Sequence, residues 1–100
     1  MFAKPMTPFE TGILRLVREH DEKYTARQIA VLILTAHKSD ATVRGVAEEL
    51  GLKKPTITRA ADRLEEDGLL VRKDDEEDRR SVLIVATSQG QKFLAKLGKD

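Results

Sequence analysis

The stretch PTITRAADRLEEDG, Pro55 to Gly68, decides the fold. Its apolar residues recur at i, i+3, i+4 and i+7, a spacing that places them on one stripe of an α-helix: Ile57, Ala60, Ala61 and Leu64. Pro55 suits the first helical position, because its missing N–H would have had no partner there. Gly68 suits the left-handed residue that follows a last helical turn. The sequence therefore predicts a helix over residues 55–67.

The charges at the two ends of this helix oppose its macrodipole. Lys53 and Lys54 precede the helix, and an acidic run, residues 65–67, ends it. Each well-placed charge of this kind costs roughly 0.3–1 kcal/mol. Charges that break a local rule together often serve a site rather than the helix. Cations at the leading end suit a phosphate-lined groove, whereas the alternative interpretation is a solvated helix whose charge pattern has no function.

A second short helix precedes this one and completes a helix-turn-helix pattern over residues 42–67. The run TVRGVAEELGL has apolar residues at the same spacing: Val43, Val46, Ala47 and Leu50. Thr42 is available as the N-cap and Gly51 as the C-terminal stop, which predicts a helix over residues 43–50. Two short helices joined by a tight turn form a helix-turn-helix, although such pairs also occur in proteins that bind no DNA.

Two strand-like runs follow Gly68 and predict a β-hairpin. They are LLVRK and SVLIVA, with strands expected over residues 70–73 and 82–86. Residues 74–80 between them are too many for a two-residue turn. An isolated two-stranded hairpin is marginal in water, so this one must pack on the helices. The fold class expected is mainly α (α+β), a winged helix-turn-helix with a two-stranded β-wing over residues 69–87.

The run DRRSVLIVATSQGQ, residues 78–91, resembles the wing signature of the MarR family of winged-helix transcription regulators. That signature has an acidic residue, any residue, an arginine, a hydrophobic strand, a threonine and a glycine: here Asp78, Arg80, residues 82–85, Thr87 and Gly90. The helix pair also matches the family, so the resemblance extends from about Tyr24 to Leu94. It implies a recognition helix in the major groove of DNA and a wing arginine that reaches the minor groove.

The remaining helices are predicted from their caps. A helix over residues 8–20 opens at Thr7 or Pro8. A second, over residues 26–38, has a capping box between Thr25 and Gln28. Its apolar run, residues 29–36, could be a buried strand, but the cap and the length favour a buried central helix. A last helix, over residues 88–97, begins after Thr87 and ends at Gly98.

Composition bounds the function. A chain of 100 residues without a solenoid repeat suits one domain over residues 1–100. The absence of cysteine excludes disulfides, thiolate metal sites and cysteine redox sensing, which separates this chain from thiol-sensing members of the family it resembles. The net charge of +1 means that any DNA affinity must come from where the charges lie.

Several classes of protein are not expected. The longest apolar run, residues 29–34, is too short to span a bilayer, and the N-terminus lacks a signal-peptide pattern, so a cytoplasmic protein is expected. His20 and His37 have no metal-ligand spacing. No nucleophile elbow, phosphate loop or framed carboxylate pair is present in the sequence. We therefore expect no enzyme, no cofactor and no metal.

A homodimer through the N- and C-terminal helices is expected from two apolar stripes. One stripe lies in the first helix (Phe9, Ile13, Leu16, Val17) and the other in the last (Phe93, Leu94, Leu97). MarR proteins typically continue with another long helix, whereas this sequence stops at Asp100, so a smaller and weaker dimer is expected. The resemblance allows a small-molecule effector, but no residue pattern here supports one.

The candidate DNA contacts fall into three groups. The front of the recognition helix supplies residues expected to read base edges: Thr56, Thr58 and Arg59. Other basic residues are expected to hold phosphates: Lys53, Lys54 and Arg63. The wing supplies one of two arginines: Arg79 or Arg80. The function expected is a sequence-specific regulator of transcription that binds double-stranded DNA and represses.

The alternative is a winged-helix module that binds protein and little or no DNA. The run over residues 72–80 has four basic and five acidic residues and so a net charge of −1, which disfavours insertion between phosphates. Asp78 could fix a neighbouring arginine, or the acidic residues could simply keep the hairpin solvated.

Overall fold

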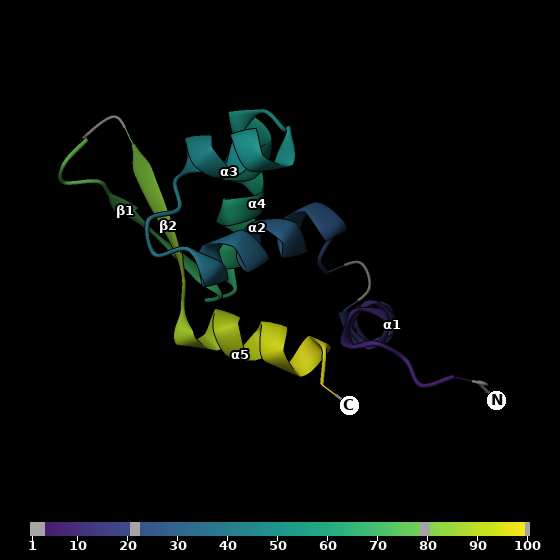
Figure 1. Ribbon diagram of the computed structural model, residues 1–100. Coiled ribbons are helices and arrows are strands. Elements are labelled where there is room, and N and C mark those ends of the chain that lie inside the picture. Colours follow the sequence, from purple (N-terminus) through teal and green to yellow (C-terminus); the bar gives the residue numbers. More distant parts are fainter. Residues whose placement is uncertain (1–3, 21–22, 79–80, 100) are drawn as a thin grey trace.

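The computed structural model describes residues 4–20, 23–78 and 81–99 (Figure 1). The elements follow the order α1 (Pro8–His20), α2 (Ala26–His37), α3 (Val43–Leu50), α4 (Lys54–Glu66), β1 (Leu70–Asp74), β2 (Val82–Ala86) and α5 (Ser88–Leu97). The two strands form one antiparallel sheet. This is the winged helix-turn-helix predicted from the sequence, and the apolar run in α2 is helical rather than a strand.

The predicted helix ends are confirmed by their hydrogen bonds. The Thr25 hydroxyl accepts from the Gln28 amide at 3.2 Å, and the Gln28 side chain accepts from the Thr25 amide at 2.8 Å, which completes the capping box. Gly51 and Gly68 have φ angles of 67° and 77°, so both take the left-handed conformation that ends a helix. Four boundaries differ by one residue: α2 ends at His37, α4 begins at Lys54 and ends at Glu66, and β1 ends at Asp74. Pro55 is therefore the second helical residue of α4, after the N-cap residue Lys53.

The core surrounds α2. Figure 1 shows α3 and α4 on one side of α2 and α5 on the other, with the hairpin beside them. The largest fully buried side chains come from α2, α4 and both strands: Leu32, Ile57, Leu64, Leu70, Ile84 and Val31. The expected burial of the α2 run holds for Val31, Leu32 and Thr35, which are buried, but not for the whole run. Ile33 is 43% exposed.

The hairpin packs on the helices as expected. Its register runs from Leu70 opposite Ala86 to Asp74 opposite Val82. The Ile84 amide donates to the Ala41 carbonyl at 2.9 Å, which joins β2 to the connection between α2 and α3. The hairpin is therefore held by backbone hydrogen bonds on one side and by the side chains of the core on the other.

Helix α1 packs mainly along α5 and leaves most of its apolar stripe uncovered. The Arg15 guanidinium donates to the carbonyls of Lys96 and Leu97, the second at 3.2 Å, and so caps the end of α5. Leu97 is buried, whereas Phe9 and Val17 are 76% and 55% exposed. Leu97 was expected to lie in an interface with a second subunit. This expectation is corrected, because the side chain is covered within its own chain. None of the helices in the described ranges is long and apolar enough to cross a membrane.

Candidate nucleic-acid interface

The first two turns of α4 carry most of the predicted contact residues on an exposed surface. Ile57 and Ala60 point into the core, so the residues between them face outward. Lys53, at the N-cap position, makes no side-chain cap hydrogen bond. The remaining candidates in this part are Lys54, Thr58 and Arg59, which are exposed, and Thr56, which is half-buried. The five residues expected at the leading end of the recognition helix are therefore all at least partly exposed, around the first two turns of α4.

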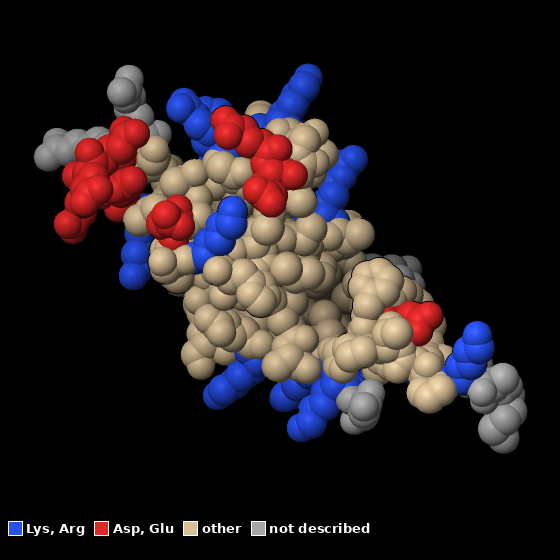
Figure 2. All heavy atoms as spheres, in the orientation of Figure 1, with Lys and Arg blue, Asp and Glu red and all other residues tan. Residues whose placement is uncertain are grey.

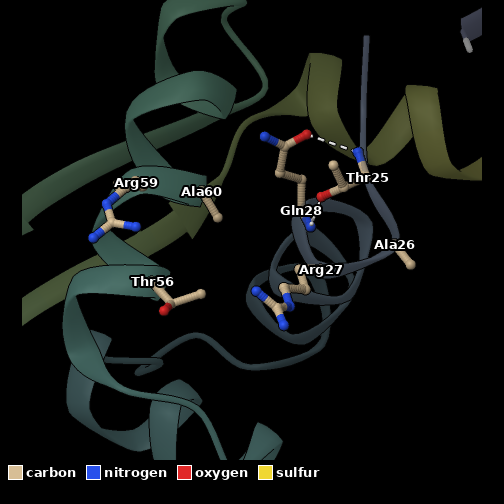
Figure 3. Close-up of a pocket in the computed structure, with 7 residues that line it drawn as sticks. All are labelled: Thr25, Ala26, Arg27, Gln28, Thr56, Arg59 and Ala60. Carbon is tan, nitrogen blue, oxygen red and sulfur yellow. Dashed lines mark hydrogen bonds between the residues drawn. The ribbon is translucent and has the colours of Figure 1, made fainter. Parts of the chain in front are cut away.

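A groove of about 450 Å³ separates this part of α4 from the start of α2. Figure 3 shows Thr56 and Arg59 on the α4 wall and Arg27 on the α2 wall. The lining residues are Thr25, Ala26, Arg27, Gln28, Thr56, Arg59 and Ala60. None of the described residues that line this groove is acidic and two of them, Arg27 and Arg59, are basic, which favours a positive potential there. We call it the α2–α4 groove.

A second, smaller groove of about 180 Å³ lies between α3, α4 and the wing. Its lining residues are Thr42, Val43, Arg44, Lys54, Thr58, Ser81 and Val82. Of the described residues that line it, two are basic and none is acidic. We call it the α3–wing groove.

The last turn of α4 is held to the rest of the protein by Asp67. The Tyr24 hydroxyl donates to Asp67 Oδ2 at 2.6 Å, and Arg63 Nε lies 3.4 Å from the same oxygen. Burial, together with the hydrogen bond to Asp67, raises the pKa of Tyr24 far above its ordinary value, so the phenol stays neutral. Arg63 is half-buried in this cluster, with its guanidinium 6.0 Å from the centre of the Tyr24 ring. Its assignment to a phosphate stays a prediction.

Arg72 of β1 is clamped onto α4. Its Nη2 lies 2.7 Å from Asp62 Oδ1 and 2.7 Å from Glu65 Oε1, and its Nε donates to Glu65 Oε1 at 3.0 Å. The Arg72 amide also donates to Glu65 at 3.2 Å. The Arg72 hydrogen bonds hold the pKa of Glu65 below its ordinary value. The acidic residues that oppose the helix dipole therefore stabilise the tertiary structure. Glu65 holds the hairpin against α4 through Arg72, and Asp67 holds the segment before α2 through Tyr24.

The loop of the wing is acidic. Figure 2 shows Asp and Glu side chains gathered over the loop between β1 and β2, next to basic side chains on the neighbouring surface. The Asp75 amide donates to the Ser81 carbonyl at 3.3 Å, and the Ser81 hydroxyl donates to Asp78 at 3.2 Å. The wing arginines proposed from the sequence, Arg79 and Arg80, lie outside the described residues.

Two basic residues in these grooves were not among the sequence candidates. Arg27 lies in the first turn of α2, and Arg44 lies in the first turn of α3. Each lies in the first turn after a threonine N-cap. A cap in the sequence predicts where a helix begins, but it does not predict which part of the protein that turn faces. Only the packing of α2 and α3 against α4 shows that both arginines flank the recognition helix.

A helix-turn-helix pair with an antiparallel hairpin packed on it defines a winged-helix protein. The sequence profile of the MarR family matches residues 22–81, and this chain belongs to the MarR family. The profile covers α2, both helices of the helix-turn-helix pair, β1 and the whole stretch between the two strands.

Known relatives of this chain are transcriptional regulators. An organic hydroperoxide resistance transcriptional regulator of Bacillus subtilis is 44% identical over 62 residues, which are 62% of this chain and 42% of that protein. The PcaV transcriptional regulator from Streptomyces coelicolor superposes with a TM-score of 0.76 at 30% identity, over 91% of this chain and 67% of that one. The transcriptional repressor CouR, solved bound to a 23-mer DNA duplex, gives a TM-score of 0.75 at 29% identity, over 90% of this chain and 61% of that one. The chain thus spans less than half the length of the hydroperoxide regulator.

Proposed function

We propose that this protein regulates transcription by binding double-stranded DNA sequence-specifically, with α4 in the major groove, and that it acts as a repressor. One observation carries the proposal. The cations at the leading end of α4, Lys54 and Arg59, have no ion-pair partner within 4.0 Å among the described residues, whereas Arg63 and Arg72 are paired with the acids at the other end. The helix therefore directs its uncompensated positive charge toward one end, where a phosphate-lined groove would receive it.

The roles of the residues follow from their places on α4. Thr58 and Arg59 are exposed and Thr56 is half-buried beside them, so these three would contact base edges. Lys53 and Lys54 would hold phosphates, and Arg63 would do so only by leaving Asp67. Arg79 or Arg80 would reach DNA from the wing. The relatives reported above support this proposal, because they are transcriptional regulators and one of them, CouR, was solved bound to DNA.

Two substitutions test this proposal on sites selected from random duplexes. Arg59→Ala should cost about 1–3 kcal/mol of binding free energy on the preferred site and relax discrimination at one base pair. Lys54→Ala should weaken preferred and random duplexes alike and reduce the salt slope by about one unit, because it removes one phosphate contact. Fluorescence anisotropy titrations at several salt concentrations measure both effects. Lys92→Ala, an exposed change on α5, is the control.

The absence of any salt-dependent duplex affinity at micromolar protein and low salt would contradict the proposal. That result, together with wild-type behaviour of Arg59→Ala in every DNA assay, would favour a protein-binding module with an acidic wing.

The proposal includes a homodimer through the terminal helices, with α1 as its main surface. Phe9, Ile13 and Val17 form an apolar stripe that is 76%, 44% and 55% exposed, and contiguous apolar surface of this kind usually marks an interface. Two-fold pairing would also place two recognition helices about 34–36 Å apart, one turn of DNA. Two modules would then read two half-sites.

Ile13→Asp should convert the dimer to a monomer, whereas Ile33→Asp should leave its mass unchanged. The two isoleucines make a matched pair, because they are 44% and 43% exposed and lie on helices α1 and α2. Neither change should unfold the chain, since each side chain reaches water. Sedimentation equilibrium over a wide concentration range measures the mass. A wild-type monomer that persists to hundreds of micromolar would rule out the dimer.

A further inference from the structure

Two basic grooves border the recognition helix on different sides. The α2–α4 groove is lined by Arg27 from α2 and by Arg59 from α4, and Figure 3 shows the Arg59 guanidinium at the outer edge of the α4 wall. The α3–wing groove has Arg44 and Lys54. In each groove one cation comes from α4 and the other from a neighbouring helix, so the positive charge is not a property of α4 alone.

These cations have no acidic partner among the described residues, unlike Arg63 and Arg72. Arg27 and Arg44 are exposed, and neither lies within 4.0 Å of an acidic side chain among residues 4–20, 23–78 and 81–99. Arg72 and Arg63, by contrast, bind carboxylates of α4 itself. A guanidinium group on a groove wall without a carboxylate is available to an anion from outside.

The side chains, rather than the helix ends, would supply the donors in these grooves. At the start of α2, the capping box already uses the amides of Thr25 and Gln28. At the start of α3, the Gly45 amide donates to the Thr42 hydroxyl at 2.9 Å. Each threonine cap satisfies one first-turn amide, and the arginine side chain is the charged donor that each helix adds to its groove.

We propose that the two grooves receive the two sugar-phosphate backbones that border the major groove, with Arg27 contacting one strand and Arg44 the other. This inference rests on the proposed function, because it places α4 in the major groove. The major groove of B-DNA is about 12 Å wide and admits one α-helix, so a backbone runs along each side of that helix. The two basic grooves lie where those backbones pass, and α2 and α3 act as a second pair of DNA contacts outside the recognition helix.

The salt dependence of duplex binding tests the number of contacts. Arg27→Ala and Arg44→Ala should each weaken binding to preferred and random duplexes by roughly three- to tenfold and reduce the salt slope by about 0.9. The double variant should reduce the slope by about 1.8, because the two sites share no partner. Arg27→Lys and Arg44→Lys should keep the wild-type slope, since they keep the charge. Lys92→Ala, which removes the same charge from α5, should leave the slope unchanged.

Phosphate-ethylation interference on the selected site tests the assignment to strands. Arg27→Ala should abolish interference at phosphates of one strand, and Arg44→Ala at phosphates of the other. Two results overturn this inference and leave the proposed function standing. One is loss of interference at the same phosphates in both variants. The other is a wild-type protein that binds DNA with the same salt slope as the two alanine variants. A wild-type protein without salt-dependent duplex affinity overturns the proposed function itself. Stabilisation by inorganic phosphate that Arg27→Ala abolishes, with an unchanged DNA slope, would make the α2–α4 groove a small-anion site and also overturn the inference.

Discussion

Replacing Gly90 by alanine is expected to lower the free energy of unfolding by about 3 kcal/mol or more, at the upper end of the range for overpacking. A Cβ atom on Gly90 would lie 2.1 Å from the carbonyl oxygen of Leu69 and 3.0 Å from its carbonyl carbon. These are backbone atoms, which cannot rotate away as a side chain would. Moving them means separating the start of α5 from the junction between α4 and β1.

That junction has little freedom to move, because two further hydrogen bonds join it to the same turn. The Thr87 amide donates to the Leu69 carbonyl at 3.0 Å, and the Thr87 hydroxyl donates to the Gly68 carbonyl at 2.7 Å. Denaturant melts followed by circular dichroism measure the loss of stability. The matched control is Gly12→Ala, where the added Cβ lies 3.4 Å from its nearest neighbour, the Leu97 carbonyl oxygen. This control should gain about 0.5–1 kcal/mol from the helix preference for alanine, and equal effects at the two glycines would contradict the steric account.

Leu32→Ala should destabilise the protein by about 2–5 kcal/mol, whereas Ile33→Ala should change its stability by less than about 0.5 kcal/mol. The two residues are neighbours in one apolar run of α2. Leu32 is fully buried where α2 meets α4, β2 and α5, so its truncation leaves a cavity among elements that are fixed by other contacts. Ile33 is 43% exposed and loses little surface burial on truncation. Urea titrations of the two variants decide the matter, and similar midpoints for both would show that α2 is not the centre of the core.

The local features of this fold could be predicted because each depends on a few adjacent residues. The caps at Thr25, Thr42 and Thr87 and the left-handed residues Gly51 and Gly68 follow from hydrogen bonds within three or four positions. The apolar stripe of α4 follows from helical periodicity. The sequence therefore placed every helix within about one residue of its observed ends.

Contacts between distant residues could not be predicted in this way. Periodicity identifies an apolar stripe but not what covers it, so Leu97 and Phe9 look alike in the sequence although one is buried within the chain and the other is 76% exposed. The partner of Glu65 lies seven positions along the chain, beyond a turn, and the sequence suggested only an unfavourable dipole interaction. Arg27 was missed for the same reason, because its proximity to α4 depends on tertiary packing.

The unequal anchoring of α4 has a consequence for the thermodynamics of binding. Tyr24 and Arg72 hold its last turns through Asp67 and Glu65, whereas the N-cap residue Lys53 makes no side-chain hydrogen bond at its first. Local opening of a helix requires least free energy where few contacts hold it, so the turn that we propose to meet DNA is also the turn with fewer side-chain hydrogen bonds to hold it. Association with a duplex would then order this turn as well as bury surface. The heat-capacity change of DNA binding would then have two contributions, one from the surface buried by the rigid parts of the interface and one from the ordering of this turn.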